Sequence, residues 1–359
     1  MRTGYATLPL HGGRAPAWLF RRMVRLARAL ALHVIEADGT AGLLRRLSDP
    51  FWFQAFGCVL GFDWHSSGLT TTTTGALKEG LRGLEADTGL CVAGGKGAAG
   101  RRTPADLEAA CAAWGTEAAP LVRASRLAAK VDSAAVQDGY QIYHHAFVAT
   151  REGAWCVIQQ GMRDATGLAR RYHWLGEGLE SFVREPHAAV CCDARGAALN
   201  LVAAESATAQ DAMLRLAREP AAETERLLRR LPELRLPRRH AVTLRDVDPR
   251  RLRRILLSTW ERAPADFSEL LLTPGLGARA LRALALCAEL VHGTPVSTRD
   301  PARFSFAHGG KDRTPYPVDR TVYDHTIAVL ESGLRRAPVE RREREAALRR
   351  LAAFAGGDR

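Results

Sequence analysis

The feature that most constrains the fold of this chain is a pair of β-forming runs joined by a short turn. Residues 139–150 and 154–160 are rich in β-branched and aromatic side chains, and Arg151-Glu152-Gly153 lies between them. Two such runs around a glycine-bearing turn predict a β-hairpin. Shorter apolar runs at 188–192 and 198–203 predict further strands. The first part of the chain is therefore expected to contain a sheet.

Helical patterns surround these strands. Pro16 and Pro104 each begin a helical stretch, and Asp49-Pro50 precedes a third over residues 51–60. The threonine- and glycine-rich segments 63–74 and 94–97 are predicted to be loops. From residue 208 onward the pattern is helical and rich in arginine. We therefore predict an α+β fold, with a mixed module that holds the hairpin or a small sheet over residues 1–210. An all-helical module with a basic tail follows over residues 211–359.

The distribution of charge indicates an anionic partner. The 51 lysines and arginines outnumber the 39 acidic residues and give a net charge of +12. Fourteen arginines lie within residues 215–262 and seven within 335–350, so the excess is concentrated in the C-terminal part. Such surfaces attract nucleic acids, because neutralised phosphates release their condensed counterions. Only four of the basic residues are lysine, and codon usage alone can produce such a preference for arginine. The positions of the basic residues are therefore more informative than their total number.

Features that mark export or membrane insertion are missing from the sequence. No apolar run approaches the ~20 residues of a membrane-spanning helix, and arginines interrupt the amphipathic stretch after Pro16. The 7 cysteines form no Cys-x-x-Cys pair, which favours buried thiols over a zinc or redox centre. We therefore expect a cytoplasmic protein.

The most specific motif is Pro274-Gly275-Leu276-Gly277, which joins a short apolar helical segment to a second helix with Arg279 and Arg282 in its first turns. The motif resembles the helix–hairpin–helix of DNA repair proteins, whose core is an apolar residue between two glycines. Glycines allow a tight bend and a close approach to a ligand, and the N-terminus of the second helix directs N–H groups at a phosphate. We expect sequence-independent binding of DNA at these six residues; the alternative is a plain connection between helices.

Two more candidate residues follow this motif. Val318-Asp319-Arg320-Thr321 is similar to the segment that carries the catalytic aspartate of helix–hairpin–helix DNA glycosylases such as endonuclease III. The spacing is longer than in that family, and Arg279 stands near the place of the lysine nucleophile of its bifunctional members. Asp319 is therefore expected to act as that aspartate or simply to cap the next helix. Lys311, in a glycine-containing loop, is expected to bind phosphate or to be solvated.

The hairpin is where the sequence places catalysis. Alternation along its first strand predicts His145 and Tyr143 on one face and His144 and Ile142 on the other. A divalent cation, Mg²⁺ or Mn²⁺, is expected to polarise a phosphate and activate water. Asp138 and His145 are the predicted metal ligands, and the full catalytic set consists of these two with Gln160, Lys96, His65 and Asp319. The alternative is that these polar residues merely end a hairpin.

Several longer strings carry a resemblance that covers most of the chain. They include residues 2–13, Asp49-Pro50-Phe51-Trp52, Asp63-Trp64-His65-Ser66, Gly94-Gly95-Lys96-Gly97 and residues 140–145. In these the chain resembles a family of bacterial and archaeal proteins called domain of unknown function 763. The resemblance implies that the whole length is one recurring unit and implies no activity.

These observations predict a DNA-binding protein that processes or repairs DNA, most simply as a metal-dependent nuclease. Three alternatives remain open at this point: a DNA-binding protein without catalytic activity, a base-excising glycosylase, and an RNA-binding protein.

Overall fold

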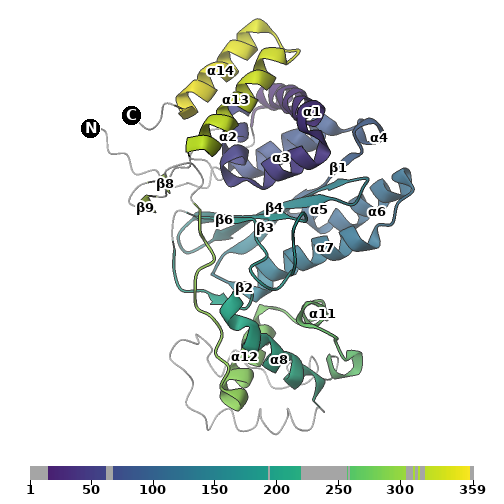
Figure 1. Cartoon of the computed structure of the whole chain (residues 1–359), viewed down its shortest axis with the longest axis vertical. Coiled ribbons are helices and arrows are strands. Elements are labelled where there is room, and N and C mark those ends of the chain that lie inside the picture. Colours follow the sequence, from purple (N-terminus) through teal and green to yellow (C-terminus); the bar gives the residue numbers. More distant parts are fainter. Residues whose placement is uncertain are drawn as a thin grey trace.

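A five-stranded antiparallel sheet forms the centre of the molecule (Figure 1). The computed structural model describes residues 15–61, 68–192, 195–219, 257, 259–304, 310–311, 314–315 and 320–355. The strand order is β1-β3-β4-β5-β6. The strands are β1 (Leu90–Lys96), β3 (Gln141–Thr150), β4 (Trp155–Arg163), β5 (Leu168–Leu175) and β6 (Ala189–Cys191).

The predicted hairpin is confirmed as β3 and β4. Val148 pairs with Cys156 and Ala149 with Trp155 on either side of the turn. Side chains alternate across the sheet, so that Val148 belongs to the hydrophobic core on one face and Phe147 to the core on the other. Both faces of this hairpin are therefore covered, which explains its long apolar runs.

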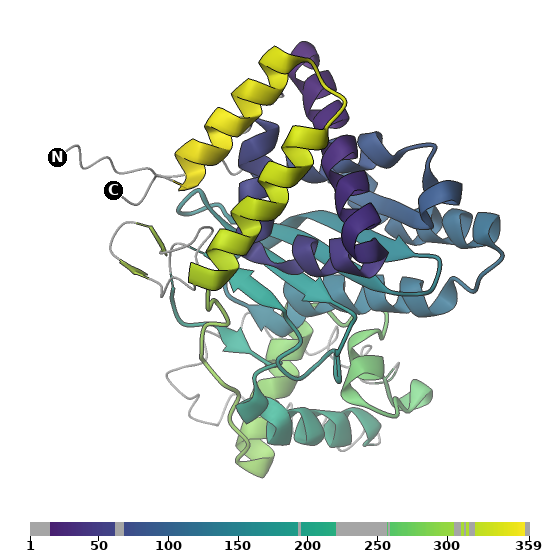
Figure 2. The ribbon, with the colours of Figure 1, turned by 45° about the horizontal axis from the view of Figure 1, so that its top comes forward.

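The first core lies between the sheet and helices from both ends of the chain (Figure 2). These helices are α1 (Ala17–Ser48), α2 (Pro50–Leu60), α3 (Gly68–Leu81), α13 (Arg320–Arg336) and α14 (Arg341–Ala355). Arg25 pairs with Glu343 at 3.0 Å, and Arg350 donates to the carbonyl of Val59 at 2.7 Å. These contacts connect α14, near the C-terminal end, with α1 and α2 on this face of the sheet.

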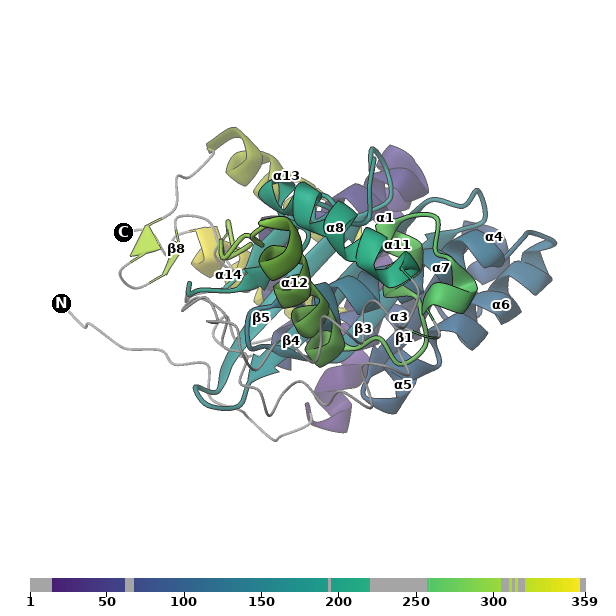
Figure 3. The same ribbon diagram turned by 90° about the horizontal axis from the view of Figure 1, so that it is seen from below.

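The second core covers the opposite face, where Phe147, Tyr172 and Trp174 are completely buried. Helices from the middle of the chain enclose it (Figure 3). They are α6 (Thr103–Trp114), α7 (Ala119–Lys130), α8 (Ala207–Arg218), α11 (Phe267–Leu271) and α12 (Ala278–His292). The shorter elements are α4 (Glu85–Thr88), α5 (Ala98–Arg101), β2 (Val136–Gln137), β7 (Leu199–Asn200), β8 (Gly310–Lys311), β9 (Thr314–Pro315), a π-helical turn η1 (Val131–Ala135) and a 3₁₀ turn η2 (Ala204–Ser206).

Two segments that the sequence predicts as loops are regular structure. Residues 94–96 complete strand β1, and a Cβ at Gly94 would lie 2.4 Å from the Thr103 hydroxyl and 2.3 Å from the His145 carbonyl oxygen. Glycine there allows α6 and β3 to approach the strand closely. The threonines belong to α3, where the Thr74 hydroxyl bonds the carbonyl of Thr70 at 2.8 Å. The hydroxyls of Thr71 and Thr74 are thus satisfied within the helix.

The α+β class is confirmed, with helices at the C-terminal end of the chain. The division at residue 210 stays a prediction, although α13 and α14 share a core with α1 and α2. Within the described ranges, no helix combines the length and the apolar character that a bilayer crossing requires.

Candidate functional site

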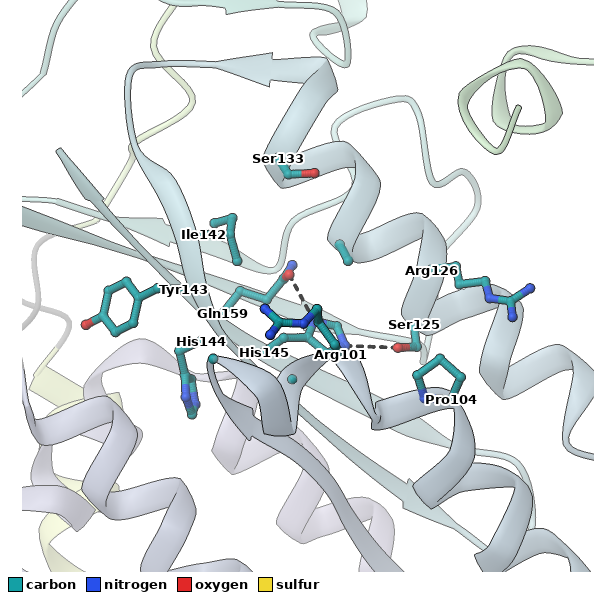
Figure 4. Close-up of a pocket in the computed structure, with 13 residues that line it drawn as sticks. Arg101, Pro104, Ser125, Arg126, Ser133, Ile142, Tyr143, His144, His145 and Gln159 are labelled. Carbon is teal, nitrogen blue, oxygen red and sulfur yellow. Dashed lines mark hydrogen bonds between the residues drawn. The ribbon is translucent and has the colours of Figure 1, made fainter. Parts of the chain in front are cut away.

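His145 lies at the centre of a buried group of polar side chains on the second-core face of the sheet. Gln159 is its direct partner on β4, and the Nδ1 atom of His145 lies 2.9 Å from the Oε1 atom of Gln159. On the other side of the ring, the Oγ atom of Ser125 in α7 lies 2.9 Å from Nε2 (Figure 4). Helix α7 and strands β3 and β4 therefore place a hydroxyl, an imidazole and an amide next to one another.

The orientation of the Gln159 amide follows from its other neighbours. Its Nε2 atom donates to the carbonyl oxygen of Ala128 at 3.2 Å and to the carboxylate of Asp132. A carbonyl oxygen can only accept a hydrogen bond, so the Oε1 atom of Gln159 must face His145.

This orientation fixes the tautomer of His145. Because Oε1 of Gln159 accepts, Nδ1 of His145 carries the proton, and Nε2 accepts the proton of the Ser125 hydroxyl. Burial lowers the pKa of His145, and the hydrogen bond that its ring donates to Gln159 offsets only part of this effect. A neutral imidazole, the form that can act as a base, is therefore favoured beside Ser125.

Asp132 anchors the far end of this polar group. It lies in the π-helical turn η1 that continues α7, a type of turn often found at functional sites. Its Oδ2 atom accepts from Nε1 of Trp174 at 2.9 Å, and its Oδ1 atom lies 2.6 Å from Nε2 of His187. The carboxylate, the amide, the imidazole and the hydroxyl form one continuous chain of hydrogen bonds, called the Ser125–Asp132 relay below.

The relay ends in a pocket of about 510 Å³. Ser125, His145 and Gln159 all line it, together with Arg101 from α5 and Arg126 from α7. The volume lies in the range of small-molecule sites. None of the residues that line this pocket is acidic, whereas two are arginines. The pocket therefore favours a ligand that carries negative charge.

A bulge at Tyr143 changes which faces of the sheet Ile142 and Tyr143 occupy relative to His144 and His145. The pairing of β3 with β4 shifts between Ile142 and His144. As a result Ile142 packs with the second core and lines the His145 pocket, and Tyr143 is hydrogen-bonded to Gln160. The predicted faces of Ile142 and Tyr143 were therefore wrong, because a bulge adds one residue to the strand.

Gln160 and Lys96 meet on the opposite face from His145, around His144. Both pair with His144 across the sheet, and the Lys96 ammonium lies 5.7 Å from the centre of the Tyr143 ring. The Nε2 atom of His144 lies 3.0 Å from the Thr74 hydroxyl of α3. Neither Gln160 nor Lys96 lines the pocket of His145. The structure thus separates these two predicted catalytic residues from the relay.

Asp138 is held by other groups and does not join His145. Its Oδ2 atom accepts from Arg170 at 2.8 Å and from the Tyr172 hydroxyl at 2.7 Å, and its Oδ1 atom accepts from the backbone N–H of Tyr140. Burial raises the pKa of Asp138, while Arg170 and Tyr172 act in the opposite direction. Three hydrogen bonds and the Arg170 ion pair therefore hold the Asp138 carboxylate, and both ring nitrogens of His145 have other partners, so the structure does not bring these two predicted ligands together. Across the described ranges, no cluster of three His, Cys, Asp or Glu residues has the geometry for a metal ion.

The segment Pro274–Gly277 forms an exposed bend between α11 and α12. Gly275 has φ +82°, and a Cβ there or at Gly277 would meet no atom within 4 Å. Gly277 is the N-cap of α12 and contributes no side-chain cap. Leu276 between them is 1% exposed and belongs to the second core. Leu276 therefore anchors the bend in the core, while the two glycines leave space around it; the resemblance to a helix–hairpin–helix stays a prediction.

The two arginines of α12 have different surroundings. Arg279 is exposed, whereas Nε of Arg282 donates to the Gln137 side chain at 2.7 Å, and Gln137 in turn donates to the carbonyl of Ala278. Arg282 thus helps to fix α12 against β2. Arg279 is therefore the exposed cation of this pair.

A basic cleft of about 360 Å³ lies beside the bend, defined by Arg123, Arg262, Pro264, Glu269, Leu272 and Thr273. Glu269 accepts from the backbone N–H of Ala265 at 2.8 Å, while Asp266 accepts from the N–H of Glu269. This reciprocal pair caps α11. The carboxylate in the cleft is therefore already engaged with backbone, and Arg123 and Arg262 supply positive charge.

Three predicted residues lack a described side-chain environment. His65 and Asp319 lie outside the described residues, and for Lys311 the structure gives only its place in β8. Four residues of this pocket and relay were not predicted from the sequence, namely Arg101, Ser125, Arg126 and Gln159. Ser125 falls in an amphipathic helix at a position where a polar residue faces the apolar side; that mismatch is the signal that could have identified it.

A family model described as a protein of unknown function (DUF763) matches residues 4–318. The match ends just before α13 begins at Arg320. No curated protein and no solved structure matches the chain.

Proposed function

The chain belongs to the DUF763 family, whose description names no activity, and from the residues themselves we propose that it binds the phosphate backbone of duplex DNA. One observation carries this proposal. Pro274 and Gly275 of the bend are exposed, a Cβ at Gly275 or Gly277 would meet no atom within 4 Å, and the bend leads directly into the 15-residue helix α12.

The start of α12 supplies the groups that a phosphate oxygen needs. The first N–H groups of a helix have no partner within the helix, and the helix dipole adds partial positive charge there. Gly277 allows an oxygen to approach these groups, and Arg279 adds a full positive charge in the first turn. Backbone contacts of this kind predict binding without strong sequence preference.

The basic cleft supports the proposal that the protein contacts more than one phosphate of the DNA backbone. Arg123 and Arg262 line it, and Thr273 of the cleft directly precedes Pro274 of the bend. Successive phosphates along a strand can therefore meet positive charge from Arg123 of α7, from Arg262 before α11 and from Arg279 of α12. An extended backbone contact should bind with a steep dependence on salt concentration.

A metal-dependent nuclease built on Asp138 and His145 does not form part of the proposal. Arg170 already neutralises Asp138, and both ring nitrogens of His145 are occupied by Ser125 and Gln159. Binding of Mg²⁺ or Mn²⁺ at other residues, and base excision through Asp319, stay predictions. DNA binding is independent of both.

The proposal is tested by measuring the affinity for a fluorescent 20-base-pair duplex at several salt concentrations. Gly277→Ala is the sharpest variant, because its φ of −95° suits alanine and the new methyl group meets no protein atom. We expect the methyl group to block the phosphate and weaken binding about tenfold, which corresponds to about 1.4 kcal/mol. Arg279→Gln should lower the slope of log affinity against log salt by about 0.9.

Arg341→Gln is the matched control, since Arg341 is 91% exposed on α14, on the other side of the sheet. Equal effects of Arg279→Gln and Arg341→Gln would show diffuse attraction to a basic protein and would refute binding at the bend. Competition by duplex RNA at the same salt separates the RNA-binding alternative, because tighter binding of RNA would assign that ligand instead.

A further inference from the structure

We propose that Ser125 is a nucleophile activated by His145, and that the pocket above them hydrolyses a phosphate ester through a covalent phosphoserine. This proposal goes beyond DNA binding, because binding alone assigns no catalytic activity to the protein. Three observations carry it: the relay that orients the hydroxyl, the pocket into which the relay opens, and the charge of that pocket.

The relay has the order of groups that activates a serine. Ser125 donates to Nε2 of His145, and Nδ1–H of His145 donates to Gln159, with 2.9 Å for each contact. A nucleophile, a base and a third group that orients the base are the parts of a serine or cysteine hydrolase site, and an amide serves as the third group in some of them. Asp132 and the Ala128 carbonyl hold that amide in the required orientation. Gln159 is therefore a positioning residue.

The pocket gives a substrate access to the relay. Ser125 and His145 are 3% and 6% exposed, so bulk water reaches them little, yet both line the cavity of about 510 Å³. Figure 4 shows the Ser125 hydroxyl directed at His145 and Gln159 on the far side of the ring. A partly dry site of this kind strengthens electrostatic interactions with a bound anion.

The charge of the pocket selects the substrate class. Arg101 and Arg126 come from different helices, and no acidic residue lines the cavity. Guanidinium groups match phosphate oxygens and stabilise the charge that develops on them during transfer. A neutral ester would gain nothing from this arrangement.

The reaction balances without a further reagent. The Ser125 oxygen attacks phosphorus, its proton passes to Nε2 of His145, and the ester oxygen leaves with that proton as an alcohol. Water then attacks the phosphoserine and gives a proton to His145. The Oγ–P bond breaks, and the Ser125 oxygen takes the proton back. The sum is ester plus water to alcohol plus phosphate.

The test uses the full chain and two chromogenic substrates, p-nitrophenyl phosphate and bis(p-nitrophenyl) phosphate, in buffer with EDTA. We expect hydrolysis of at least one, and the two arms show whether a monoester or a diester is preferred. Ser125→Ala should lower kcat on the order of 10²- to 10⁴-fold, the usual contribution of a nucleophile and its base. Ser133→Ala is the matched control, because Ser133 is an exposed serine that lines the same pocket.

A fluorophosphonate probe tests the nucleophile directly. Mass spectrometry should find the adduct on Ser125 in the wild-type protein and in Ser133→Ala, and a rate at least tenfold lower in His145→Gln. Labelling elsewhere, or equal labelling after loss of His145, would overturn the proposal. So would hydrolysis of p-nitrophenyl acetate without hydrolysis of either phosphate, since it would assign a carboxylic ester. Gly277→Ala should leave all these rates unchanged, which separates this proposal from that of DNA binding.

Discussion

Asp138 and Arg170 form an ion pair at 2.8 Å in which the side chains are 1% and 0% exposed. The other Nη atom of Arg170 reaches Asp300 at 2.9 Å, and the guanidinium lies 4.5 Å from the centre of the Tyr140 ring. The pair therefore ties the start of the hairpin to strand β5 and to the segment after α12. Asp138, selected from the sequence as a catalytic residue, has the surroundings of a structural one.

Asp138→Ala should destabilise the protein by about 3–5 kcal/mol, because it leaves the charge of Arg170 buried with only part of its compensation. Urea unfolding followed by circular dichroism measures this. Asp164→Ala is the control, since Asp164 is exposed and such changes usually stay within about 0.5 kcal/mol. A stable Asp138→Ala protein would contradict the structural role of the pair.

Stability should fall as the pH drops below about 6.5, because of the buried histidines. Burial lowers the pKa of His144 to about 3, and His145 and Lys96 act in the same direction. Between about 6.5 and 3 the unfolded chain therefore binds a proton that the folded protein excludes, and each such histidine contributes a slope of about 1.4 kcal/mol per pH unit.

His144→Gln tests this, since glutamine keeps a polar contact with Thr74 and does not titrate. The slope of unfolding free energy against pH between about 6 and 4 should be smaller in the variant by about 1.4 kcal/mol per unit. Identical slopes would mean that His144 accepts a proton in the folded state.

Leu276→Ala should cost about 2–5 kcal/mol, the usual range for a buried leucine that leaves a cavity. Leu272→Ala, a few residues away and only half-buried, should cost less. Thermal unfolding compares the two. If Leu276→Ala were as mild as the control, the bend would not depend on the second core for its shape.

Gln159→Met should lower kcat for the phosphate substrate at least tenfold while KM stays nearly constant. Methionine fills the same space but gives Nδ1–H of His145 no strong acceptor, so the tautomer that activates Ser125 is no longer favoured. A rise in KM with unchanged kcat would assign Gln159 to substrate binding instead of positioning. This prediction holds only if Ser125 is the nucleophile.

Local patterns identified much of the fold. The hairpin was predictable because its β-branched and aromatic residues flank a glycine turn, and Asp49 marked α2 because its side chain accepts from the N–H of Phe51 at 2.8 Å. Strand β5 was harder to recognise, since Arg170 and Arg171 interrupt its apolar pattern. Those arginines are buried only because Asp138, Asp300 and Gln54 meet them from distant parts of the chain.

Sequence patterns alone could not predict most of the Ser125–Asp132 relay. His145 and Gln159 were both recognisable as polar residues of one hairpin, but Ser125 reaches His145 only through the packing of α7 on the sheet. The bulge at Tyr143 leaves no signal of its own in the residues around it. By contrast the bend before α12 was predictable, because its geometry depends on glycines within five residues of each other.

The position of α13 and α14 beside α1 and α2 has a consequence for biosynthesis. Arg25 meets its partner Glu343 only after 318 further residues have been added to the chain. During translation α3 and the sheet can cover much of α1 early, but the surface of α1 and α2 that packs against α13 and α14 stays uncovered until those two helices leave the ribosome.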